Sequence, residues 1–217
     1  MKQNENGRSM IEMLGVLAII GVLSVGGLAG YAKMMAQYRI NATLQQVQMI
    51  SAKLSTQAAN GGSYEGLSNY TAYRLNALPS EIIDSVNEDD KEITLSNAYA
   101  GNVKIEAASI SSGDCSESSC DNQAYTITYT GLHQDACLAL GGSPWNSSRN
   151  SSFIGFGVGK ASAETSLKSE LKQDCTHGTG SGYAYACDGA SIPMDLDVVT
   201  SACQCGDGNC VLIMKFF

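Results

Sequence analysis

The sequence predicts an α+β protein, in which one long N-terminal helix is followed by an antiparallel β-sheet domain that disulfides hold together. Three features support this class. Residues 13–32 contain no charge and no proline, residues 34–59 carry apolar side chains at helical spacing, and residues 124–130 alternate as a β-strand does. All eight cysteines lie from Cys115 onward, which confines any disulfides to the predicted sheet domain.

The apolar run from Met13 to Ala32 is long enough to cross a membrane. As an α-helix it would extend about 30 Å, which matches the hydrocarbon thickness of a bilayer. Glu12 stands directly before the run, and a carboxylate at the edge of hydrocarbon is costly unless a cation neutralises it. We therefore interpret Glu12 as a functional residue. The alternative is an acid that reaches the headgroup layer from a plain membrane anchor.

The residues around Gly7 resemble the signature of type IV prepilins. A short polar leader, MKQNENG, ends at Gly7, Glu12 is the fifth residue after it, and an uninterrupted apolar run follows. The resemblance implies cleavage by a prepilin peptidase between Gly7 and Arg8, and methylation of the new N-terminus. Arg8 departs from the family pattern, which places an apolar residue after the cut. Cleavage would free the amine of Arg8, which could neutralise Glu12 of a neighbouring subunit and set the register between them.

The same resemblance implies an architecture and a location. It implies a pilin-like lollipop with a leader at residues 1–7, a stalk helix at 8–59 that is transmembrane at 13–32, and a globular α+β head at 60–217. The subunit would lie in the bacterial inner membrane with its head in the periplasm, and would then join a surface pilus. Its partners would be copies of itself in a helical fibre, the prepilin peptidase, the inner-membrane assembly machinery and, before assembly, membrane lipid.

The charge of the chain is unevenly distributed. Residues 1–60 carry five Lys or Arg against two acids, whereas residues 61–217 carry eight against nineteen, a balance of −11. An acidic domain repels a phosphate backbone, so we expect no direct nucleic-acid binding.

The cysteines indicate an oxidising compartment. Their even number in the predicted extracytoplasmic part is typical of disulfides. The candidates are Cys115, Cys120, Cys137, Cys175, Cys187, Cys203, Cys205 and Cys210. Short spacing predicts the pairs Cys115 with Cys120 and Cys205 with Cys210, and it leaves the other four unassigned. A zinc site at Cys203, Cys205 and Cys210 is the alternative, but no paired CxxC spacing or histidine pattern accompanies them.

Residues 34–59 are predicted to continue the helix with one face toward a sheet. Apolar positions at steps of three or four define that face, and Gln45, Gln46, Gln48 and Lys53 take other faces. The segment Asn60-Gly61-Gly62 is expected to end the helix.

The remaining elements are predicted from local patterns. We expect strands at 92–96, 103–107, 124–130 and 210–217, with one sheet face on the stalk helix and the other toward solvent or a neighbour. We expect short helices within 75–86, at 132–140, at 164–173 on the surface, and from Pro193 to Ala202. Residues 143–160 are expected to form an edge strand or a loop, and His177 a loop. The acidic residues 88–90 are expected to form a solvated turn, with a calcium site as the alternative.

The sequence favours a structural assembly protein over an enzyme. His133 and His177 are its two histidines, and no GxSxG, HExxH or glycine-rich phosphate loop occurs. We expect no catalytic activity, no cofactor and no metal. The predicted function is a structural subunit of a type IV pilus. The alternatives are a secretion-system pseudopilin, a minor or adhesive pilin, and a membrane-tethered binding domain that does not polymerise.

Overall fold

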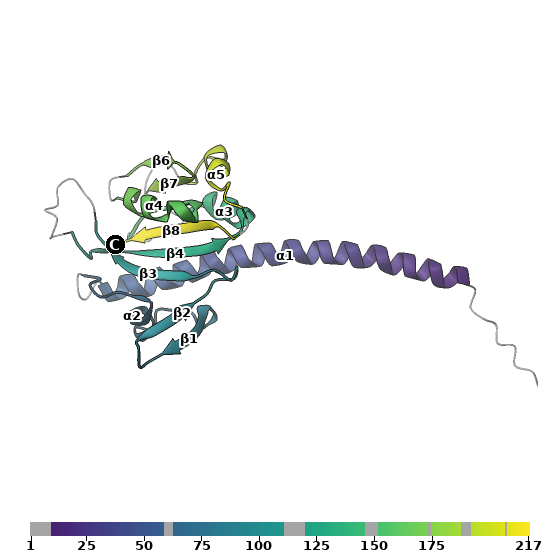
Figure 1. The fold of residues 1–217 in the computed structure, drawn as a ribbon, viewed down its shortest axis with the longest axis horizontal. Helices are drawn as coiled ribbons and strands as arrows, with labels where there is room; N and C mark the ends of the chain where they lie inside the picture. The colour runs from purple at the N-terminus through teal and green to yellow at the C-terminus, as the bar shows by residue number, and fades with distance from the viewer. Residues whose placement is uncertain are drawn as a thin grey trace, which may run out of the picture. The chain divides into compact units, whose positions relative to one another are not determined.

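The computed structural model describes residues 10–58, 63–110, 120–145, 152–172, 175–187, 192–206 and 208–217. The chain divides into two units, of which the first ends at Arg39. The second, Ile40–Phe217, is called the compact unit below. The longest element, α1 (Met10–Ala58), contributes to both units (Figure 1). The predicted order of a long N-terminal helix followed by an antiparallel sheet is confirmed.

The compact unit is built on a six-stranded antiparallel sheet in the order β3-β4-β8-β5-β7-β6 (Figure 1). Its strands are β3 (Val103–Ala108), β4 (Ala124–Leu132), β5 (Phe153–Lys160), β6 (His177–Gly180), β7 (Tyr183–Cys187) and β8 (Cys210–Phe216). A separate hairpin pairs β1 (Ile83–Asn87) with β2 (Glu92–Leu95). The short helices are α2 (Asn69–Arg74), α3 (Gln134–Gly141), α4 (Glu164–Glu170) and α5 (Leu196–Ala202).

One face of the sheet packs on the second half of α1. Val47, Ile50 and Leu54 of α1 are buried in the same core as Tyr125 and Phe216 of the sheet. The apolar face predicted for this half of the helix is therefore largely correct. Gln46, however, was predicted on another face and is buried. It lies four residues before Ile50, and residues at that spacing share one face of a helix.

The opposite face of the sheet is covered by another part of the compact unit, whereas it was predicted to face solvent or a neighbour. Leu167 and Leu171, in and directly after α4, pack on Val211 and Ile213 of β8. Thr126 and Thr128 of β4, which lie on this face of the sheet, are also buried. The prediction failed because α4 was treated as a surface helix, although its leucines provide an apolar side.

Strand β5 lies inside the sheet and not at its edge, because it pairs with both β7 and β8. Its sequence alternates bulky residues with glycines, and the glycines face α4. A Cβ placed on Gly157 would come within 2.3 Å of Leu167 Cδ1. The glycines, which suggested an edge or a loop in the sequence, instead allow α4 to approach an interior strand closely.

Several other predicted elements need correction. The short helix expected within residues 75–86 is present only as the 3₁₀ helix η1 (Ser80–Ile82), because β1 begins directly after it at Ile83. Helix α2 was not predicted; it begins after Ser68, whose side chain accepts a hydrogen bond from the Thr71 amide. His177 begins the short strand β6, and Pro193 precedes α5, which begins at Leu196. The predicted helix stop at residues 60–62 lies outside the described residues.

Two predicted elements agree well with the structure. Helix α3 ends at Gly141 and carries Cys137, and the Gly142 amide donates back to carbonyls of the helix. Strand β8 is buried along its whole length between β4 and β5, as its continuous apolar sequence predicted.

Candidate functional site

The first half of α1 presents an apolar surface that its own unit does not cover. Every residue from Met10 to Met34 is exposed. The large exposed apolar side chains there include Ile11, Leu14, Leu17, Ile20, Leu23, Val25 and Leu28. This helix is apolar and long enough to cross a membrane. An apolar surface of this extent marks a contact with lipid or with other protein molecules.

Glu12 lies in the first turn of α1, at the end of this apolar surface. It is the sole acidic residue between Met10 and Arg39, where Lys33 and Arg39 are the basic residues. A carboxylate in the first helical turn interacts favourably with the unpaired amides there. Its side chain is exposed and therefore accessible to a cation from another molecule. The predicted processing residues Gly7 and Arg8 lie outside the described residues.

Glycines in the first half of α1 pack against no other part of the chain that the structure describes. A Cβ placed on Gly15, Gly21, Gly26, Gly27 or Gly30 would meet nothing within 4 Å. Each glycine lowers helix propensity by about 1 kcal/mol relative to alanine. Small residues on a membrane helix allow neighbouring helices to approach closely, so these glycines are suited to contacts with other chains.

Disulfides hold the compact unit together. Cys137 of α3 is bonded to Cys203 at the end of α5, Cys175 to Cys187 across the β6–β7 hairpin, and Cys205 to Cys210 at the start of β8. The structure thus pairs Cys205 with Cys210, as their spacing predicted, and it assigns the four cysteines that the sequence left open. Cys115 lies outside the described residues, so its pairing with Cys120 stays a prediction.

The Cys137–Cys203 bridge is the largest of these constraints. Its sequence separation is 66, against 5 for Cys205–Cys210. In the chain-entropy description, such loops correspond to about 4 and about 2 kcal/mol of stabilisation respectively. The long bridge joins α3 to the end of α5, and both of its cysteines are fully buried in the core of the compact unit.

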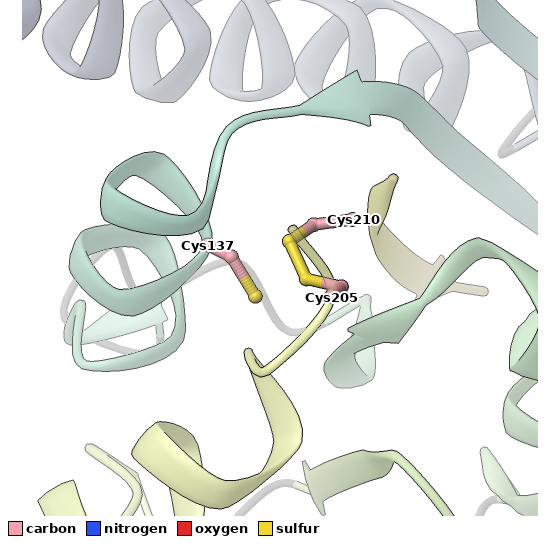
Figure 2. A group of neighbouring side chains, drawn as sticks. All are labelled: Cys137, Cys205 and Cys210. Carbon is pink, nitrogen blue, oxygen red and sulfur yellow. A yellow bond between two sulfur atoms is a disulfide. The ribbon is translucent and has the colours of Figure 1, made fainter. Parts of the chain in front are cut away.

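Two disulfides meet where the sequence suggested an alternative zinc site. The Sγ atoms of Cys137, Cys205 and Cys210 all lie within 4.8 Å of one another. Figure 2 shows Cys137 directed toward the Cys205–Cys210 bridge. Zinc is bound by thiolates, whereas these sulfurs form disulfides. The spacing that suggested metal ligands therefore corresponds here to two adjacent covalent links.

The comparisons with known proteins agree with this architecture. The family model PilS, described as PilS N terminal, matches residues 37–215. The chain belongs to the PilS family of type IV pilins. Among solved structures, it is similar to the crystal structure of a type IV b pilin from Salmonella typhi, with 14% identity and a TM-score of 0.51. That match covers 80% of this chain and 97% of the other. A comparison with curated proteins found no match.

The PilS match begins at residue 37 and thus falls mainly on the compact unit. The low identity to the Salmonella typhi pilin means that the likeness concerns the fold. The resemblance to type IV pilins, first suggested by Gly7, Glu12 and the apolar run, is therefore confirmed by a different part of the chain.

A group of charged residues on the α4 side of the sheet was not predicted from the sequence. Lys168 of α4 pairs with Glu106 of β3 and with Glu164, and Lys104 also pairs with Glu106. Burial alone would raise the pKa of Glu106, but the hydrogen bonds from the two lysines outweigh it and lower that pKa. Lys215, on the neighbouring strand β8, is itself buried. The available signal was a single lysine inside the otherwise apolar segment CVLIMKFF.

Proposed function

We propose that this pilin-family chain is the structural subunit of a type IV pilus fibre, which polymerises through α1. The observation that carries the proposal is the exposed apolar half of α1. Before assembly, lipid would cover this surface in the inner membrane. In the fibre, the same surface of neighbouring subunits would replace the lipid.

The glycines of α1 explain how assembly can compete with lipid. Lipid tails are as apolar as leucine, so moving the helix from lipid to protein yields little hydrophobic free energy. Close van der Waals packing is then the main favourable contribution. Gly15, Gly21, Gly26, Gly27 and Gly30 leave open space on the helix into which side chains of another subunit can pack.

Glu12 would set the register of this packing. In the proposal, prepilin peptidase cuts after Gly7, the amine of Arg8 becomes the N-terminus and is methylated, and it pairs with Glu12 of the adjacent subunit. An unpaired carboxylate within an apolar bundle is costly, so this pairing favours one offset between subunits over all others. Assembly machinery of the inner membrane would act on the processed subunit, and its compact unit would face the periplasm and then the cell surface.

The test is mechanical shearing of the native cells, followed by N-terminal sequencing and intact-mass measurement of this chain. We expect it in the sheared fraction, beginning at Arg8, with two hydrogens lost for each disulfide and one methyl group added. A chain that stays in the membrane with its leader intact would contradict the proposal and indicate a simple membrane tether. A processed chain that stays in the membrane would contradict a surface fibre and support a pseudopilin or a minor pilin.

A further inference from the structure

Three polar side chains form a row across the α4 side of the sheet. Thr126 of β4 lies opposite Glu106 of β3 and opposite Lys215 of β8 in the strand register. Side chains that face each other across neighbouring strands lie about 5 Å apart at Cβ. Together with Lys168 of α4, this row lines a hollow of about 300 Å³.

Lys215 is a buried cation without a counter-charge. Its side chain is 5% exposed, and its Nζ donates a hydrogen bond of 2.7 Å to the Leu171 carbonyl. An ammonium group has three donors, and a carbonyl carries no net charge. Within the described part of the chain, no carboxylate lies within ion-pair distance of Lys215. Burial, with a smaller contribution from Lys172, lowers the pKa of Lys215 to about 8.

Thr126 supplies a second unsatisfied group in the same hollow. Its side chain is buried, and its Oγ1 has no hydrogen-bond partner among the described residues. A buried hydroxyl without a partner costs free energy, and such groups in native proteins usually have an identifiable reason. A ligand oxygen in the hollow would accept a hydrogen bond from both Thr126 and Lys215.

Glu106 does not neutralise Lys215, because it is engaged by other lysines. Lys104 and Lys168 both pair with it, and Lys168 also pairs with Glu164. Of the charged residues that line the hollow, Lys168 and Lys215 stand against Glu106, a local balance of +1. The wider segment 61–217 has a balance of −11. The hollow is thus a positive site in an acidic domain.

We propose that this hollow binds an oxyanion, either a carboxylate or a tetrahedral anion of the phosphate and sulfate class. Lys215 Nζ and Thr126 Oγ1 donate hydrogen bonds to its oxygens, and Lys168 adds positive charge at the rim. The volume is at the lower end of ligand pockets, which suits a small anionic group. The site does not depend on fibre assembly, because all its residues belong to the compact unit.

The test is calorimetric titration of the full chain in detergent micelles at pH 7 and constant ionic strength, with sodium sulfate and sodium acetate as separate probes. We expect binding of at least one probe. Sulfate binding alone identifies a tetrahedral ligand, acetate binding alone identifies a carboxylate, and binding of both identifies a site that accepts either class. If neither probe binds, the proposal is wrong.

Substitutions locate the binding. Lys215→Met keeps the length of the side chain, removes the buried charge and should fold, because an apolar group is easier to bury than an unpaired cation. We expect it to weaken binding at least about tenfold, and Thr126→Val to weaken it about threefold. Lys91→Met, in the exposed turn between β1 and β2, should bind as the wild type does. Equal affinity of Lys215→Met and the wild type would overturn the proposal.

The pH dependence gives an independent readout. Lys215 must be protonated to bind an anion, so affinity should be full below about pH 8 and fall as the pH rises through that value. The other charged groups that line the hollow stay charged over this range, because the lysines beside Glu106 lower its pKa and the glutamates beside Lys168 raise the pKa of that lysine. Sulfate and acetate also keep their charges between about pH 6 and pH 9. A flat profile over this range would contradict a role for Lys215.

Discussion

Both halves of α1 are rich in apolar side chains, but only the second half buries them within its own unit. Val25 and Leu28 are 71% and 69% exposed, whereas Val47 and Ile50 are 2% and 0% exposed. Aliphatic side chains of the same types occur in both halves, so the residue type alone does not decide which of them are buried. What differs is the partner: the sheet covers the second half, and the first half requires a partner outside the chain.

Glycines show the same contrast. In the first half of α1, Gly21 and Gly26 have open space where a Cβ would lie. In the compact unit, a Cβ on Gly101 would lie 1.8 Å from the Thr130 carbonyl oxygen, and one on Gly157 would clash with Leu167. Internal packing thus explains why these positions of the compact unit are glycines. The glycines in the first half of α1 require an explanation from contacts with other molecules.

The largest expected effect on assembly is that of Glu12→Ala, which removes the acid at the end of the exposed apolar surface of α1. Glu12→Ala would leave the Arg8 amine of a neighbouring subunit without its partner inside an apolar bundle. Removing one member of a buried ion pair costs about 3–5 kcal/mol. We therefore expect the amount of chain in the sheared fraction to fall at least about a hundredfold. Quantitative immunoblotting of sheared and membrane fractions measures it.

Glu65→Ala is the matched control for Glu12→Ala, because Glu65 is an exposed acid of the compact unit. It should leave the sheared fraction unchanged. Both variants should melt at the temperature of the wild type, since neither side chain is buried. Normal amounts of Glu12→Ala in the sheared fraction would mean that Glu12 does not set the register.

One substitution made on each half of α1 separates folding from assembly. Leu54 is 1% exposed in the core, so Leu54→Ala should lower the free energy of unfolding by about 2–5 kcal/mol. Leu28→Ala should change it by less than about 0.5 kcal/mol, because Leu28 has no partner to lose in its own unit. Urea unfolding of the two variants in detergent, followed by circular dichroism, measures both values.

Leu28→Ala should still reduce the sheared fraction, because the lost side chain would pack against another subunit. A Leu28→Ala variant with wild-type assembly would argue that this position faces away from neighbouring subunits. An equal loss of stability in both variants would contradict the division of the helix at Arg39 and Ile40.

The sequence predicts best where one local pattern decides the outcome. The unbroken apolar character of residues 13–32 and the glycine pair after Leu140 each predict an element without reference to distant residues. Strand β8 was predicted for the same reason, because its apolar residues leave no polar face. The register role of Glu12 remains a proposal, because its partner belongs to another chain.

The predictions failed where a residue is covered by a segment that is distant from it in the sequence. Thr126 and Thr128 are polar residues typical of a solvent face, yet both are buried, on the side of the sheet where Leu167 and Leu171 pack. The glycines of β5 suggested an edge strand or a loop, whereas Gly157 leaves room for Leu167 of α4. The polar row of Glu106, Thr126 and Lys215 was not predicted for the same reason, because its residues come from three different strands, β3, β4 and β8.

The smallest expected effect concerns the ion pairs of Glu106. Lys104 and Lys168 lower the pKa of Glu106 despite its partial burial, so ionised Glu106 stabilises the folded state. This stabilisation is present above the unfolded carboxyl pKa of about 4.3 and is lost as the pH falls through the lower folded value. Glu106→Gln should therefore lower the free energy of unfolding by up to about 1 kcal/mol at pH 7. The difference from the wild type should shrink below about pH 4.

Urea unfolding at a series of pH values measures this difference in the free energy of unfolding. Glu92→Gln, which changes an exposed acid of β2, is the control. A Glu106→Gln deficit that persists unchanged at acidic pH would show that the side chain acts through packing and not through its charge.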